Sequence, residues 1–388
     1  MFNLGVKWKE LAVICCAVGL AGIGAMLLLH RSHSHLLNND LRSRKPVVHR
    51  ARRATLNRAL YKAKMLALAN VPPRTDCSEP MASSSKVGRT KVYRTVSASG
   101  STRVVTKEAV LHPCPPRLWP VHAPYPNAGA VLPFSRIVAY YGNFYSTRMG
   151  VLGEYPPDKM LSMLESTTKA WAAADPSTPV TPALDYIAVA AQNVPRKDGK
   201  YRFRMPPGQI EKAIRMGDRI HGLVFLDVQP GWSTVEAEVP RLLPYLKHPN
   251  VELALDPEFA LVEGKRPGEW VGTMNASDIN FAARFLAKIV RENHLPPKIL
   301  VIHRFTERMV TEFHAVKPLP EVQIVMDMDG FGSPVLKTST YKAYIARQPV
   351  QFTGFKLFYK NDVKIGGALM TPTQILSLSP RPSYILYQ

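Results

Sequence analysis

The chain has 388 residues and a formal net charge of +21 at neutral pH, and 46% of its residues are hydrophobic. This length excludes a single small domain and fits one large domain with additional segments. The charge is uneven, because residues 31–120 contain 18 lysines and arginines against four acids, whereas residues 121–388 contain 30 against 24. The basic character therefore belongs mainly to an arm, and nucleic acid is not an expected partner of the protein.

The first segment, residues 1–30, contains a long apolar run. Leu11–Leu29 carries no charge over nineteen residues, within the roughly 17–25 residues that a membrane-spanning helix needs. Because this run is longer than the apolar core of a cleaved signal peptide, we expect an uncleaved, single-pass anchor in the lipid bilayer. The arginines after the run favour a cytoplasmic main domain, whereas the short N-terminus with Lys7 and Lys9 and the cysteine-free main domain favour export. We favour export, which places the main domain outside the cytoplasm, in the cell envelope.

Residues 31–120 have the composition of a basic linker. Within them, Asn57–Asn70 has helical spacing of apolar residues, and Lys91–Val96 and Thr102–Val110 alternate as a hairpin would. Such an arm can bind anionic lipid or an anionic wall polymer through charge, or it can be a solvated linker extended by its own repulsion. The pair Cys77 and Cys114 would form a disulfide in an oxidising compartment, although spacing alone does not establish the bridge.

The main domain, residues 121–388, alternates short apolar runs with amphipathic ones. The expected strands are Arg136–Asn143, Val180–Val189, Gly222–Val228, Val251–Leu255, Lys298–Phe305, Val322–Asp329, Phe352–Tyr359 and Ser383–Tyr387. The expected helices are Pro157–Ala174, Pro207–Ile220, Thr234–Leu246, Asn275–Asn293, Thr306–Val316, Pro334–Arg347 and Thr371–Leu378. Eight strands alternating with seven helices predict an α/β fold, a parallel (β/α)8 barrel of the TIM type.

Two features qualify this barrel prediction. The last strand ends beside Gln388, so the barrel lacks its last helix, and either the arm helix or residues 121–135 would have to cover that flank. A doubly wound open sheet is the alternative architecture, but no glycine-rich phosphate loop follows the first strand.

The carboxyl ends of barrel strands carry the active site of such folds. Asp256 and Glu258 follow one buried strand and share a face, and Asp227 ends the strand before it. The candidate catalytic residues are Glu258, Asp227, Asp256 and Asp329. The candidate substrate-binding residues are Tyr141, Asn143, Asp185, Gln229, Trp232, His303, Arg304, Asp327, Lys356, Tyr359 and Tyr387. The structural alternative is that these acids pair with Arg304, Lys356 and backbone amides as polar plugs.

Acids beside aromatic rings suit a carbohydrate site. Rings stack on sugar faces, while a carboxylic acid and a carboxylate act on the glycosidic bond. We expect Glu258 to donate the proton and Asp227 or Asp329 to be its ionised partner, because Phe259 and Asp256 both raise the pKa of Glu258.

The barrel with its Asp256-Pro-Glu258 strand end resembles the (β/α)8 glycoside hydrolases, and the whole domain resembles a bacterial family of exported, membrane-anchored barrel proteins. The resemblance implies a hydrolase whose general acid is Glu258. The chain departs from the larger glycosidase clan at Lys356, where that clan has a nucleophilic glutamate.

Two other functions stay open. One is a hydrolase or lyase dependent on Mg²⁺ or Mn²⁺, because carboxylates and one histidine gather at the strand ends; the absence of a His-x-His pair and of cysteine ligands disfavours zinc. The candidate ligands of such a metal ion are Asp227, Asp256, Glu258, His303, Asp327 and Asp329. The other is a non-catalytic binding or scaffold protein of the cell envelope. The site residues alone predict no cofactor, although a divalent metal is compatible with them.

Overall fold

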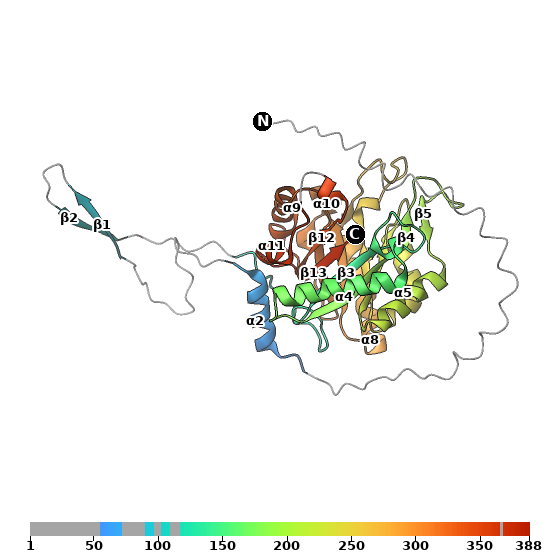
Figure 1. Ribbon diagram of the computed structural model, residues 1–388, viewed down its shortest axis with the longest axis horizontal. Helices are drawn as coiled ribbons and strands as arrows, with labels where there is room; N and C mark the ends of the chain where they lie inside the picture. Colours follow the sequence, from blue (N-terminus) through green and yellow to red (C-terminus); the bar gives the residue numbers. More distant parts are fainter. Residues whose placement is uncertain (1–54, 72–89, 97–101, 109–116, 365–367) are drawn as a thin grey trace.

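The computed structural model describes residues 55–71, 90–96, 102–108, 117–364 and 368–388 (Figure 1). Its centre is a closed parallel barrel, in which consecutive strands are neighbours and the last strand pairs with the first. The eight strands are β3 (Arg136–Gly142), β4 (Val180–Ala191), β6 (Leu223–Val228), β7 (Val251–Leu255), β9 (Lys298–Arg304), β11 (Val322–Met328), β12 (Phe352–Leu357) and β13 (Tyr384–Tyr387). The expected TIM-like barrel is confirmed, and the open-sheet alternative is wrong.

The helices pack on the outside of the barrel, and the main ones begin where the sequence predicts them. They are α4 (Pro157–Ala174), α5 (Pro207–Arg219), α8 (Ala276–Asn293), α9 (Pro334–Tyr341, continuing as π-helix to Ala346) and α11 (Pro372–Leu376). Asn275 caps α8, because its side chain accepts from the backbone N–H groups of Ser277 and Asp278. Shorter additions are α3 (Val151–Glu154), α10 (Asn361–Lys364) and β5 (Arg202–Arg204), which pairs antiparallel with the end of β4.

Two expected helices are wrong in form. The segment 234–246 is broken into three short turns, α6 (Val235–Glu238), a 3-10 turn (Val239–Leu242) and α7 (Leu243–Leu246), because Pro240 and Pro244 lack the N–H that a continuous helix needs. The segment 306–316 forms two 3-10 turns around a two-residue strand, β10 (Val310–Thr311), which pairs with β8 (Met274–Asn275).

The side chain of Arg304 explains why the segment 306–316 is not helical. Its guanidinium donates to the carbonyls of Thr306, Glu307 and Val310 at 2.8–3.1 Å. Glu312 then adopts a left-handed backbone with φ of 54°. The guanidinium of Arg304 thus bonds backbone carbonyls that would accept from N–H groups in a helix, and the segment does not continue as a helix.

Part of the basic arm packs on the barrel domain. Helix α2 (Arg58–Ala69) is capped by Asn57 and buries Tyr61, Met65 and Ala69. Its carbonyl at Leu68 accepts from the N–H of Arg381 at 2.7 Å, just before β13 (Figure 1). The expected hairpin also forms, because β1 (Thr90–Val96) pairs antiparallel with β2 (Thr102–Glu108).

The expected anchor, Leu11–Leu29, and all four cysteines lie outside the residues that the structure describes. Among the described residues, no helix has both the length and the apolar character needed to cross a bilayer.

The outer face of β13 is contacted by side chains from neighbouring helices. Tyr387, on the outer face of β13, accepts a hydrogen bond from Trp171 of α4 at 2.9 Å and stacks on Tyr359 with ring centroids 5.2 Å apart. Helix α11 also contacts α4. Helix α2 therefore lies beside the turn that precedes β13, and Trp171 of α4 contacts the outer face of that strand.

The segment 121–135 has a different role from the expected one. It enters the amino end of the barrel, where the backbone of Leu132 exchanges two hydrogen bonds with the side chain of Gln323, at 2.6 and 3.1 Å. Leu132 is fully buried. This segment closes the bottom of the barrel, and the opposite end, where the strands finish, is left for a site.

Candidate functional site

Contacts that cross the barrel identify the side chains that face its interior. Tyr384 of β13 reaches Asp185 of β4, Tyr141 of β3 reaches Asp227 of β6, and His303 of β9 lies near Asp185. These strands are not neighbours, so the contacts are made inside the ring. TIM-barrel interiors are ordinarily filled by Val, Ile and Leu, and this polar layer is therefore a departure that needs a reason.

One half of the polar layer is a chain of hydrogen bonds from β3 to β7. The Tyr141 hydroxyl donates to Asp227 Oδ2 at 2.8 Å and accepts from Gln229 Nε2 at 3.0 Å. The same amide group of Gln229 lies 3.3 Å from Asp256 Oδ2, and Gln229 Oε1 accepts from the N–H of Ala191. These bonds fix the orientation of Asp256 at the end of β7.

The other half is centred on a buried lysine from β12. Lys356 Nζ lies 2.9 Å from Asp329 Oδ1 and 3.8 Å from the ring centroid of Tyr141. Asp327 Oδ2 and His303 Nδ1 share a hydrogen bond of 3.1 Å. Gly354 leaves room for this carboxylate, because a Cβ there would lie 2.5 Å from Asp327 Oδ1.

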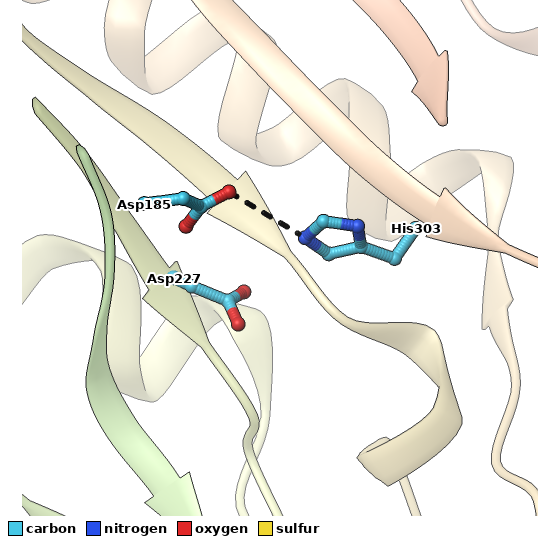
Figure 2. Close-up of side chains that lie close together, drawn as sticks. All are labelled: Asp185, Asp227 and His303. Carbon is cyan, nitrogen blue, oxygen red and sulfur yellow. Dashed lines mark ion pairs between the residues drawn. The ribbon is translucent and has the colours of Figure 1, made fainter. Parts of the chain in front are cut away.

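Asp185, Asp227 and His303 form a tight group in the middle of the barrel (Figure 2). One potential ligand atom from each lies within 4.8 Å of the other two. All three side chains are fully buried. Within the described part of the chain, Asp185 Oδ1, Asp227 Oδ1 and His303 Nε2 have no hydrogen-bond partner.

Burial shifts the pKa values of several of these buried groups toward their neutral forms. It raises the pKa of Asp185 and of Asp327 to about 7, and it lowers the pKa of His303 to about 3. The pKa of Asp227 rises well above its usual range through burial and then through the charge of Asp185. The imidazole of His303 is therefore neutral, and the cluster holds fewer negative charges than it has carboxyl groups.

Glu258 lies nearer the surface than this group. It follows Asp256 in the 3-10 turn Pro257–Phe259, and its N–H donates to Asp256 Oδ1 at 3.1 Å. Burial raises the pKa of Glu258 well above its usual range, and the charges of Asp256 and Asp329 act in the same direction. Glu258 is only partly buried, whereas Asp256 is buried, so Glu258 is the carboxyl of this pair that a ligand can reach.

The structure brings together most of the candidate residues named from the sequence. Hydrogen bonds, ion pairs or electrostatic coupling link Tyr141, Asp185, Asp227, Gln229, Asp256, Glu258, His303, Asp327, Asp329 and Lys356. Their shared position at the strand ends is why the prediction grouped them.

Four other candidates lie outside this cluster. Arg304 points away from the barrel centre to backbone carbonyls, and Tyr359 and Tyr387 belong to the packing against α4. Asn143 donates to the carbonyl of Ile187 and accepts from the N–H of Tyr145, and these bonds fix the loop after β3. A fifth, Trp232, is at the rim, where its ring packs on Tyr201 and its indole N–H donates to the carbonyl of Lys265.

Two buried features escaped the sequence analysis. Tyr384 donates to Asp185 Oδ2 at 2.6 Å. Side chains of a strand alternate between its two faces, so Tyr384 could have been placed inside the barrel only if the inward-facing residues of β13 had been known. Lys337 lies 3.1 Å from Asp362, whose carboxylate accepts from the N–H groups of Gly332 and Phe358. No short motif marks that second pair, since its members are 25 residues apart.

Chemically, the strand ends offer a carboxyl group whose pKa is raised, an ion-paired carboxylate and a deeper group of two carboxyls with a neutral imidazole. The first two suit acid–base chemistry and the third suits a cation. No protein-family model matches this chain, and no curated protein matches it.

Proposed function

We propose that the barrel hydrolyses glycosidic bonds, with Glu258 as the proton donor and Asp329 as its ionised partner. One observation carries the proposal: a partly accessible carboxyl with a raised pKa, Glu258, shares a strand end with the oriented Asp256. Retaining and inverting glycosidases both use such a protonated acid together with a carboxylate.

The proposed reaction uses the two carboxyl groups differently. Glu258 gives its proton to the glycosidic oxygen as the bond to the anomeric carbon breaks. Asp329, paired with Lys356 Nζ at 2.9 Å, is the carboxylate that faces the developing positive charge or activates the water that replaces the leaving sugar. Asp256 keeps Glu258 protonated, because a second negative charge beside it is costly.

Aromatic side chains near the rim supply the surface for the sugar. Trp270 and Tyr145 are 53% and 59% exposed, large values for such residues, and Trp232 is partly exposed between them in sequence. Their faces can stack on the apolar faces of pyranose rings. The proposed substrate is therefore an oligosaccharide or polysaccharide rather than a small charged metabolite.

The proposed location follows from the sequence. Residues 11–29 would anchor the protein in the membrane, the barrel would lie outside the cytoplasm, and the basic residues of 31–120 would hold it near anionic lipid or wall polymer. In that location the available polysaccharides are those of the cell envelope.

The decisive experiment replaces Glu258 by glutamine, which keeps the shape and removes the titratable proton. Wild-type protein is assayed for reducing-end release on a panel of envelope glycans and chitin-type oligosaccharides. Glu258→Gln should lower kcat by about 10²–10⁴-fold, the usual contribution of general acid catalysis, with an unchanged melting temperature. The matched control is Glu263→Gln, an exposed glutamate in the loop that follows.

Two results would remove the proposal. The first is equal turnover by wild type and Glu258→Gln. The second is no turnover of any glycan by the wild type, and glycan binding measured by calorimetry would then support the non-catalytic binding function in its place.

A further inference from the structure

We propose that Asp185, Asp227 and His303 bind one divalent metal ion inside the barrel, below the acids of the mouth. The proposal goes beyond the hydrolase function, because the acid–base step assigned to Glu258 and Asp329 uses none of these three residues.

The first support is geometric. The three ligand atoms come from β4, β6 and β9 and lie within 4.8 Å of one another, and Figure 2 shows both carboxylates and the imidazole gathered around one space. Metal–oxygen and metal–nitrogen bonds of about 2.0–2.2 Å place neighbouring ligand atoms about 3–3.5 Å apart. Shortening the separations between ligand atoms by up to about 1.3–1.8 Å, through rotation of the side chains, would complete such a site.

The second support is the atoms that lack partners. Asp185 Oδ1, Asp227 Oδ1 and His303 Nε2 accept no hydrogen bond from any residue that the structure describes, and all three side chains are fully buried. Burying polar atoms without partners costs several kcal/mol in total, so native proteins rarely gather them in one place. His303 Nε2 lies 3.9 Å from Asp185 Oδ2, so a cation between the two side chains would give the buried imidazole nitrogen a partner and place a positive charge beside the carboxylates.

The third support is the set of neighbours that orient these ligands. His303 Nδ1 faces Asp327 Oδ2 at 3.1 Å, which assigns the proton to Nδ1 and leaves the lone pair of Nε2 for a metal. Tyr384 donates to Asp185 Oδ2 and Tyr141 donates to Asp227 Oδ2, at 2.6 and 2.8 Å. Each ligand is thus held by one atom and free at another, which is the outer-shell pattern of metal-binding histidines and carboxylates.

The ligand set also limits the metal. Two carboxylates balance a divalent charge, and one imidazole favours Mn²⁺ or Zn²⁺ over Ca²⁺, which takes six to eight oxygen ligands. Three protein ligands leave further coordination positions for water. Although the spacing of residues in the sequence disfavours zinc, the folded site does not require a His-x-His pair.

The test uses the full chain purified in detergent. The protein is stripped with EDTA and dialysed against MnCl2, ZnCl2 or MgCl2, and its metal content and melting temperature are then measured. We expect one equivalent of Mn²⁺ or Zn²⁺ and a higher melting temperature. Tyr384→Phe should weaken the metal affinity by about 10–100-fold, as loss of an outer-shell partner does, and Asp185→Asn should weaken it more.

Two control variants separate this proposal from its alternatives. Glu252→Gln changes a buried carboxyl near the amino end of β7 and should keep the full metal content. Glu258→Gln should also keep the metal, whatever its effect on hydrolysis, so failure of the hydrolase proposal leaves this one standing. Full metal content in Asp185→Asn, or no metal in the wild type, would overturn the site.

A measurement on the wild type covers the case in which the variants fail to fold. Crystals soaked in MnCl2 should show an anomalous peak between Asp185, Asp227 and His303. A peak elsewhere, or none at these residues, would equally overturn the assignment.

Discussion

The two ends of the barrel bury polar groups in different ways. At the amino end, three buried side chains have hydrogen-bond partners: Gln323 bonds the backbone of Leu132, Lys298 on the outer face of β9 donates to the carbonyls of His248 and Val251, and Glu252 accepts from the N–H of Ile299. At the carboxyl end, Asp185, Asp227 and His303 each keep an atom without a partner among the described residues.

The difference separates structural polarity from polarity that serves a ligand. The hydrogen-bonded groups at the amino end hold two backbone segments in place. Gln323 holds Leu132 in the bottom of the barrel and Lys298 holds the turn before β7, so these groups contribute to a unique fold. Unsatisfied groups at the other end cost stability unless something binds there, which is the usual position of a functional site. Four substitutions test this comparison.

The largest effect on stability is expected at the amino end. Lys298→Met removes the donor that bonds His248 and Val251 at 2.6 and 2.7 Å and leaves Glu252 without its nearby positive charge. We expect a loss of about 3–5 kcal/mol in the free energy of unfolding, measured by urea titration. Lys288→Met, at an exposed helix position, is the control and should change it by less than about 0.5 kcal/mol. A loss below about 1 kcal/mol at Lys298 would mean that the amino end is not held by this cation.

The second prediction concerns pH and rests on the proposed hydrolysis. Because burial, Asp256 and Asp329 raise the pKa of Glu258, while Lys356 opposes them, the proton donor keeps its proton to a higher pH than a free glutamate does. Activity should therefore fall as pH rises through that raised pKa. Asp256→Asn removes a negative neighbour, so it should move this alkaline fall to lower pH by about one unit, equal to about 1.4 kcal/mol. A fall that stays in place in the variant, with kcat/KM measured from pH 5 to 10, would contradict the role given to Asp256.

The third prediction has the opposite sign to the first. In EDTA, Asp185→Asn should raise the free energy of unfolding by about 1 kcal/mol, because it replaces a buried carboxyl that lacks a partner for Oδ1. The same variant should lose the stabilisation that added metal gives the wild type. A marked loss of stability in EDTA would place Asp185 with the structural groups of the amino end instead.

The smallest effect is expected on the outer surface of the amino end. Arg136 Nη2 lies 3.0 Å from Asp175 Oδ2. Burial alone would raise the pKa of Asp175, but hydrogen bonds from Ser177, Arg136 and Thr178 outweigh it and lower the pKa to about 2. A depressed pKa gives stability above the unfolded value near 4 that is lost as pH falls toward 2.

Asp175→Asn should therefore cost about 1 kcal/mol at pH 7, after allowance for solvent screening, and nothing near pH 2. Thermal melts of the variant and the wild type at pH 7 and pH 2 measure the difference. A penalty that is equal at both values would show that the ion pair contributes little.

Much of this architecture was determined by the sequence itself. Strands of a parallel barrel are buried on both faces, so each appears as a continuous apolar run. The bounds of β6, β7 and β13 all lie within one residue of the expected ones. Local caps and prolines determined where α4 and α8 begin, because they act within a single turn of backbone.

Which residues of each strand face the barrel interior, by contrast, was decided only by closure of the barrel. His303 and Arg304 are adjacent and both polar, yet they face opposite ways. His303 points into the barrel, and Arg304 points outward and donates to backbone carbonyls of the segment 306–316, which therefore does not form a continuous helix. Likewise, Tyr384 enters the site and Tyr387 packs against α4, although both are tyrosines of β13. Neighbouring side chains on a strand face opposite ways, so the sequence placed these residues at the strand ends, and barrel closure chose which of them face the interior.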